Sequence, residues 1–135
     1  LVAAAERLGV PAGRNRILIA GCDEVLQESL RSVLNTTGRI IQLAPDSAQA
    51  ARTFSRHAAA FALVVIEQQL PGMTGVDFAA QVRASQPELP IILLTLDGEV
   101  SAEKIAKAGL ASRFVEMKKP FRTKGFLETA ARLLA

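Results

Sequence analysis

The sequence contains Leu63-Val64-Val65-Ile66 and Ile91-Ile92-Leu93-Leu94, and these two stretches decide the fold that it predicts. Both are short and apolar at every position. A strand with one face in water alternates polar and apolar residues, whereas a strand covered on both faces is apolar throughout. The two stretches therefore predict central strands of a parallel sheet that has helices on both faces.

The rest of the chain repeats a strand–helix alternation around these two strands. Strands are expected at residues 16–20, 39–44, 62–66, 90–95 and, less cleanly, 113–117. Amphipathic segments lie between and after them, near 24–35, 47–57, 75–86, 101–109 and 122–134. Regular alternation of this kind predicts an α/β fold with an open, parallel, five-stranded sheet.

The first amphipathic segment shows the helical period. Apolar residues recur there at spacings of three and four, which predicts one buried stripe along a helix. The stripe consists of Val25, Leu26, Leu30, Val33 and Leu34.

Length and composition indicate one domain in a reducing compartment. The chain has 135 residues, half of them hydrophobic, and a single cysteine, Cys22. Its longest apolar run, residues 58–66, is far shorter than the ~20 residues that span a bilayer. We expect a cytoplasmic protein. Residues 1–15 are interpreted as a short helix and a Gly/Pro linker from an upstream domain. Because the chain starts at Leu1 and not at Met, we expect it to be a fragment of a longer polypeptide. Residues 16–135 form the predicted domain.

The charge is unevenly distributed along the chain. The net charge is +3, but residues 1–103 carry −3 and residues 104–135 carry +6. A basic surface is therefore expected in the last third. A solvated helix face is the favoured interpretation, an acidic protein partner the second. Nucleic acid comes last, because the chain has no Trp or Tyr on which bases could stack.

In open parallel sheets, functional groups lie beyond the carboxyl ends of the strands. The loops to inspect are residues 21–24, 67–74, 95–98 and 118–121. Their motifs are Glu67-Gln-Gln-Leu-Pro-Gly-Met-Thr-Gly75, Leu89-Pro90 with Thr95, and Lys119-Pro120-Phe121. In this order and spacing they resemble the response-regulator receiver (CheY-like) family, from Arg16 to about Leu134. The resemblance implies a flavodoxin-like (βα)5 fold and a role in two-component phosphorelay signal transduction.

The resemblance also implies a chemistry. Family members accept a phosphoryl group from a histidine kinase on an aspartate that ends the third strand. Mg²⁺ is held by that aspartate and by an acidic pair that ends the first strand. A lysine neutralises charge, and a Ser or Thr that ends the fourth strand binds the phosphoryl group.

Compared with the family, this site is degenerate. The phosphoacceptor position holds Glu67, and the acidic pair falls on Gly21 and Cys22. The switch threonine, Thr95, and the lysine, Lys119, match. Because Mg²⁺ is bound mainly through carboxylates, we expect it to bind weakly or not at all, and we expect no metal ligand set and no catalytic residue.

A shifted alignment does not restore the acidic pair. Using Asp23 and Glu24 would drive Glu28 toward the core and expose Leu26, at a cost on the order of a few kcal/mol. Asp23 is therefore expected near the site but pointing away from the metal position. Cys22 is interpreted as a small packing residue.

Several details of the site are hypotheses. Glu67 is long enough to form an ion pair with Lys119 and to imitate a phosphorylated aspartate, and imitation would require Thr95 to point toward it. Pro120 is a candidate for a cis peptide bond. The stretch from Thr95 to Lys119 is about two residues longer than is usual in the family, so the aromatic reporter of the fifth strand is either Phe114 or replaced by Glu116.

The favoured function is that of a pseudoreceiver, a non-enzymatic module that acts by protein–protein interaction through its fourth-helix to fifth-helix face. Its partners would be its own parent polypeptide, a histidine kinase or another signalling protein, or a second copy in a homodimer. The alternative is a working phosphoacceptor in a two-component relay. A third class, nucleic-acid binding, predicts steep salt dependence.

Overall fold

A computed structural model describes residues 14–135. Five parallel strands form one sheet in the order β2-β1-β3-β4-β5. The strands are β1 (Arg16–Ala20), β2 (Ile40–Ala44), β3 (Phe61–Glu67), β4 (Ile91–Thr95) and β5 (Phe114–Lys118). The predicted flavodoxin-like α/β fold is confirmed. The predicted linker, residues 1–15, lies outside the described residues apart from its last two positions.

Helices connect the strands and follow the last one. They are α2 (Glu24–Leu34), α3 (Ser47–His57), α4 (Gly75–Ser85), α5 (Ala102–Lys107) and α6 (Thr123–Leu134). Short 3₁₀ turns, Asn35–Thr37 and Ala58–Ala60, extend α2 and α3. Each predicted helix and strand is present, with its ends shifted by two residues at most. In residues 14–135, no helix is long and apolar enough to cross a membrane.

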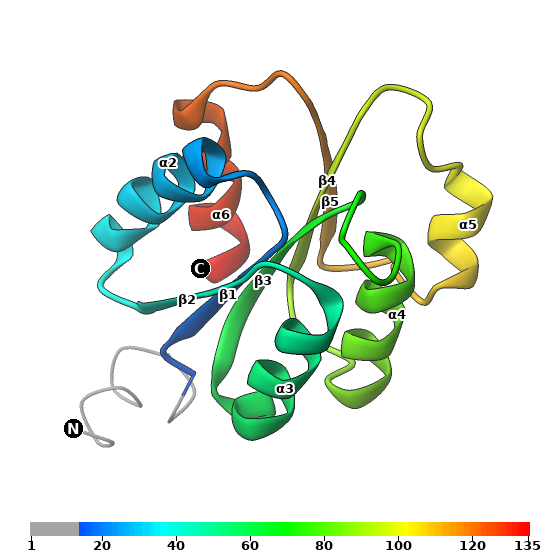
Figure 1. Cartoon of the computed structure of the whole chain (residues 1–135), viewed down its shortest axis with the longest axis horizontal. Coiled ribbons are helices and arrows are strands. Elements are labelled where there is room, and N and C mark those ends of the chain that lie inside the picture. The colour runs from blue at the N-terminus through cyan, green and yellow to red at the C-terminus, as the bar shows by residue number, and fades with distance from the viewer. Residues whose placement is uncertain (1–13) are drawn as a thin grey trace.

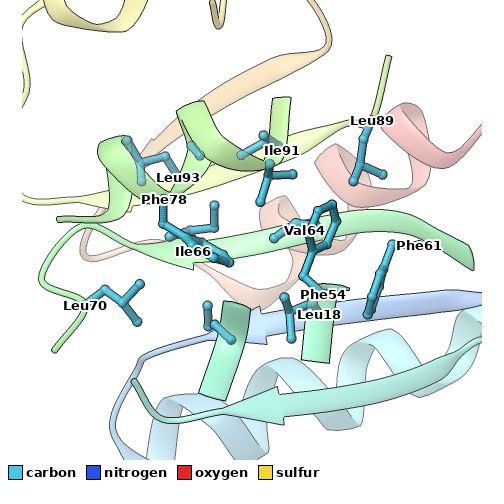
Figure 2. Close-up of a cluster of buried hydrophobic side chains, with 14 of the residues drawn as sticks. Leu18, Phe54, Phe61, Val64, Ile66, Leu70, Phe78, Leu89, Ile91 and Leu93 are labelled. Atoms are coloured by element: carbon cyan, nitrogen blue, oxygen red, sulfur yellow. The ribbon is translucent and has the colours of Figure 1, made fainter. Parts of the chain in front are cut away.

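The sheet has a layer of helices on each face (Figure 1). Helices α2 and α6 pack on one face, where Leu30, Leu34 and Phe126 are buried against the strands. Helices α3, α4 and α5 lie on the other face, where Phe54 and Phe78 pack with the strand residues (Figure 2). Two separate apolar clusters therefore enclose the sheet, as the doubly apolar strands require.

The two stretches that predicted the fold are fully buried, as are residues 17–20 of β1. Leu63–Ile66 of β3 and Ile91–Leu94 of β4 have no exposed surface. Within each strand, side chains alternate between the two faces. Leu93 contacts the cluster under α3 and α4, and Leu94 contacts the cluster under α2 and α6. This alternation also determines the face to which each functional side chain points.

The predicted stripe of α2 is correct at four positions and wrong at one. Leu30 and Leu34 are fully buried, and Leu26 and Val33 pack against the same cluster. Val25, however, is 79% exposed. It lies in the first turn of α2, faces a surface groove that the loops after β4 and β5 also line, and points away from the stripe that the other four residues form.

A buried arginine organises the connection between α5 and β5. Arg83, near the end of α4, is 7% exposed. Its guanidinium donates to the carbonyl oxygens of Gly109 (3.2 Å), Ser112 (2.7 Å) and Arg113 (3.0 Å). The main chain at Arg113 has a positive φ of 51°. The longer stretch before β5 is thus held to α4 by three charge-assisted hydrogen bonds.

Candidate functional site

The carboxyl ends of β1 and β3 and the loop after β5 enclose a small cavity. Its volume is about 260 Å³, and it is lined by Cys22, Asp23, Leu26, Pro45, Glu67, Gln69, Pro71 and Lys119. Four of the residues singled out in the sequence line it together: Cys22, Asp23, Glu67 and Lys119. Thr95 does not line it.

Glu67 and Lys119 form the predicted ion pair. The Lys119 Nζ lies 2.6 Å from the Glu67 Oε1, and the Glu67 side chain is only 7% exposed. The Glu67 Oε2 is buried and has no hydrogen-bond partner among the described residues. A largely buried ion pair of this kind is weak evidence for stability. The Glu67 carboxylate does, however, neutralise the charge of Lys119 without any phosphoryl group.

The two positions of the lost acidic pair have an unusual main chain. Gly21 and Cys22 both have positive φ, 84° and 72°. A Cβ added to Gly21 would lie 2.9 Å from the Glu67 Cβ and 3.2 Å from the Leu70 Cδ1. The first carbon of the Glu67 side chain therefore takes the space into which a side chain at position 21 would project, so the packing here favours glycine.

Cys22 packs against the cluster under α2 and α6. Burial raises the pKa of its thiol to about 12, and the negative charge of Glu67 contributes in the same direction. The thiol stays protonated at neutral pH, which disfavours metal binding and nucleophilic attack, since both need the thiolate. This agrees with a packing role.

Alkylation of Cys22 by iodoacetamide at pH 8 is therefore expected to be slow. A thiol with a pKa near 12 instead of 9.0 has about a thousandfold less thiolate at that pH. Because the folded pKa is raised, the rate should keep rising with pH above 9 rather than level off. Intact mass against time, for the native and the urea-unfolded chain, measures this. Equal rates in the two states would contradict it.

Asp23 begins α2 instead of facing the cavity with a free carboxylate. Its Oδ1 accepts a hydrogen bond from the Leu26 N–H at 2.8 Å, so Asp23 is the N-cap of the helix. An aspartate in this position stabilises the helix by satisfying an otherwise unpaired N–H group. Asp23 therefore lies near the site, and one of its oxygens is already used.

Thr95 points toward β5, and not toward Glu67. It is completely buried, and its hydroxyl donates to the Glu116 Oε2 at 2.6 Å. This contradicts the hypothesis that Glu67 imitates a phosphorylated aspartate by attracting Thr95. Thr95 shares the face of Ile91 and Leu93, whereas Glu67 shares the face of Leu63 and Val65, and the hydrogen bond to Glu116 holds the Thr95 hydroxyl on its own face.

The register of β4 and β5 shows which residue of β5 is the neighbour of Thr95. Phe114 pairs with Ile91 at the far end of the strand and packs into the cluster under α4. Glu116 pairs with Leu93 and reaches Thr95. Of the two alternatives, Glu116 therefore lies beside Thr95, and Phe114 is a core residue remote from the site.

The loop after β3 packs closely against α4. The side-chain oxygen of the buried Gln68 accepts a hydrogen bond from the Val76 N–H at 2.9 Å. The main-chain carbonyl of Gln68 accepts one from the Gly75 N–H, also at 2.9 Å. A Cβ at Gly75 would lie 2.5 Å from the Glu67 carbonyl oxygen. On the other side of the site, the Lys119–Pro120 peptide bond is cis. The two loops place Glu67 and Lys119 opposite each other.

The residues at the carboxyl ends of β1 and β3 do not fit a magnesium site. No group of three or more His, Cys, Asp or Glu residues suited to a metal ion occurs within residues 14–135. Mg²⁺ demands near-octahedral oxygen ligation. Here Glu67 is paired with Lys119, Asp23 caps a helix and Cys22 holds a protonated thiol.

Sequence reasoning overlooked two residues around the site, Gln68 and Glu99, and a third, Arg83, at the opposite end of the strands. Each uses a polar side chain to fix a main-chain segment, as the Glu99 Oε1 does for the Leu96 N–H at 2.9 Å. An amphipathic pattern does not reveal such contacts, although a polar residue directly after an apolar strand, as at Gln68, is a usable signal.

Comparisons with known proteins show the family of this chain. Residues 17–131 match the Response regulator receiver domain family. The chain is 33% identical over 118 residues to the response regulator protein FleR of Pseudomonas aeruginosa, covering 87% of this chain and 24% of the relative. It is 30% identical to the two-component response regulator PhoP of the same species, covering 89% and 50%.

Solved structures show the same fold. A receiver domain protein from Clostridium thermocellum superposes with a TM-score of 0.75 at 18% identity, over 88% of this chain and 93% of the other. The signal receiver domain of an HD domain-containing protein from Pseudomonas fluorescens gives 0.74 at 26% identity, over 90% and 87%.

The chain belongs to the response regulator receiver domain family of two-component signalling. It spans 24% of the length of FleR and 50% of the length of PhoP.

Proposed function

We propose that this receiver domain does not take up phosphate in the usual way and acts as a non-enzymatic module for protein–protein interaction. One observation carries the proposal: the carboxylate at the phosphoacceptor position is paired with the lysine at 2.6 Å, and no second carboxylate supports it, since Gly21 and Cys22 occupy the acidic positions. Phosphoryl transfer depends on positioned charges and a metal ion, and this edge supplies too few.

An exposed apolar groove beside the ion pair supports an interaction role. It has a volume of about 910 Å³ and lies between α2 and the loops after β4 and β5. Val25 and Leu96, 79% and 47% exposed, lie on its surface. Exposed apolar surface of this kind is typical of contact sites for proteins.

The proposed partners are the remainder of the parent polypeptide, a histidine kinase or another signalling protein in the cytoplasm. The basic residues of the last third are spread over α5, β5 and α6, which favours this face for an acidic partner. A homodimer through the same face is a further proposal that the charge does not support, because the two copies would bring like charges together. Lys104, Lys107, Lys118 and Lys124 are all exposed there. Charge on a surface guides association more than it determines affinity.

The test is incubation with Mg²⁺ and acetyl phosphate, followed by intact mass. We expect no added phosphoryl group, because the metal site is incomplete. In the double variant Glu67→Asp, Cys22→Asp, the first change shortens the carboxylate at position 67 and the second adds a new carboxylate beside it. Aspartate tolerates the positive φ at position 22. This variant is expected to become phosphorylated.

Stoichiometric phosphorylation of the native chain that disappears in Glu67→Gln would refute the proposal. It would establish the alternative, a working phosphoacceptor at Glu67. Phosphorylation that persists in Glu67→Gln would place the acceptor elsewhere and would also refute the proposal.

A further inference from the structure

Four side chains at the ends of β4 and β5 form two adjacent contacts, which we call the β4–β5 clasp: Thr95 with Glu116, and Asp97 with Lys118. The Thr95 hydroxyl donates to the Glu116 Oε2 at 2.6 Å, and the Lys118 Nζ donates to the Asp97 Oδ1 at 3.1 Å. Between them, the Lys119 N–H donates to the Thr95 carbonyl at 2.7 Å. The clasp thus extends the pairing of the two strands into the loop after β4.

The contact between Thr95 and Glu116 is exclusive. A threonine hydroxyl has one proton to donate, and an ionised carboxylate can only accept. Hydrogen bonds of this type are short and stronger than neutral ones. While the Thr95 hydroxyl donates its proton to Glu116, it has none to donate to an anion bound beside Glu67. Such an anion would have to compete with the Glu116 carboxylate for this hydrogen bond.

The loop after β4 is also held from its other side. The Glu99 carboxylate accepts from the Leu96 N–H at 2.9 Å and from the Gln69 Nε2 at 3.1 Å. The Glu99 N–H donates to the Leu96 carbonyl at 3.1 Å. Residues 96–99 are therefore connected to β5 through the clasp and to the loop after β3 through Gln69.

We infer that Glu116 is a positioning residue that fixes Thr95, and with it the loop before α5, in one arrangement regardless of what happens at Glu67. The interaction face formed by α5, β5 and α6 then keeps one conformation, whatever the state of Glu67. This inference rests on the proposed function only for the role of that face. The orientation of Thr95 can be measured whether or not the domain accepts phosphate, so the two can fail separately.

The test measures the χ1 rotamer of Thr95 by NMR, from three-bond couplings of its methyl carbon to the main-chain nitrogen and carbonyl carbon. The native chain is expected to show a single rotamer. In Glu116→Ala, which removes the acceptor, the couplings should average between rotamers. In Glu116→Gln, the amide oxygen still accepts, so the single rotamer should be kept. Glu128→Ala, at an exposed position of α6, is the matched control.

Amide hydrogen exchange of Leu96 and Glu99 gives a second readout. Losing a hydrogen bond to a charged group raises the equilibrium constant for local opening about tenfold or more. The exchange rate of an amide in the opened segment rises by the same factor. We expect this increase in Glu116→Ala, little change in Glu116→Gln and none in Glu128→Ala.

Two results would overturn the inference. One is rotamer averaging of Thr95 in the native chain. The other is a single, unchanged rotamer in a folded Glu116→Ala variant whose Leu96 and Glu99 amides exchange at the native rate. If Glu116→Ala fails to fold, the same couplings in Glu116→Gln and in the native chain decide the question, because averaging in either would contradict the role of Glu116.

Discussion

The substitution Gly75→Ala is expected to lower the free energy of unfolding by about 3 kcal/mol. The added Cβ would lie 2.5 Å from the Glu67 carbonyl oxygen and 2.7 Å from the Gln68 Cα. Both atoms belong to the main chain at the end of β3, which is held in the centre of the sheet and has little freedom to move. The clash therefore has to displace the first turn of α4. Urea denaturation followed by far-UV circular dichroism measures the loss.

A matched control is available in α6. Gly125 also lies in a helix, and among the described residues no neighbouring atom lies within 4 Å of an added Cβ. Gly125→Ala should stabilise the protein by about 0.5–1 kcal/mol, because alanine is the better helix former. If both substitutions had the same small effect, the close packing of Gly75 against β3 would be wrong.

The second large effect is expected for Arg83→Ala. This change removes three hydrogen bonds from a charged, buried group to the carbonyls of Gly109, Ser112 and Arg113. Water can replace part of the loss, because all three acceptor residues are exposed. We therefore expect destabilisation of about 2–4 kcal/mol. Thermal unfolding should shift downward by about 10 °C.

Two further variants show whether geometry or charge matters at this position. Arg83→Lys keeps the positive charge but lacks the planar guanidinium that donates in several directions, so it should lose most of the same stability. Arg132→Ala removes an exposed arginine of α6 and should change stability by less than about 0.5 kcal/mol. Full stability in Arg83→Lys would show that charge alone is sufficient.

The fold was predictable from the sequence because burial leaves a periodic pattern. The run Leu63–Ile66 can be apolar at every position only if both faces of its strand are covered, and the structure buries all four residues. Val25 shows where such reasoning fails. Periodicity identifies a stripe but not its end, and Val25, in the first turn of α2, is left exposed.

The site was partly predictable for a different reason. Glu67, Cys22 and Lys119 end or follow strands, and the parallel topology brings such ends together. The partner of Thr95 was not determined by this reasoning, since it depends on the register of β5 against β4 and on an added loop of unknown course. Once the structure pairs Glu116 with Leu93, the carboxylate is within reach of the hydroxyl. Only three-dimensional coordinates supply that alignment.

The carboxylate at position 67 belongs to a glutamate and is joined to the main chain by carbon–carbon bonds. An acyl phosphate on an aspartate is hydrolysed with time, so a signal that it carries has a lifetime. Under the proposed function, the glutamate that contacts Lys119 at 2.6 Å carries no acyl phosphate, so hydrolysis does not limit the lifetime of this ion pair. The electrostatic state of this edge therefore lasts as long as the polypeptide itself, unless a binding partner separates the two side chains.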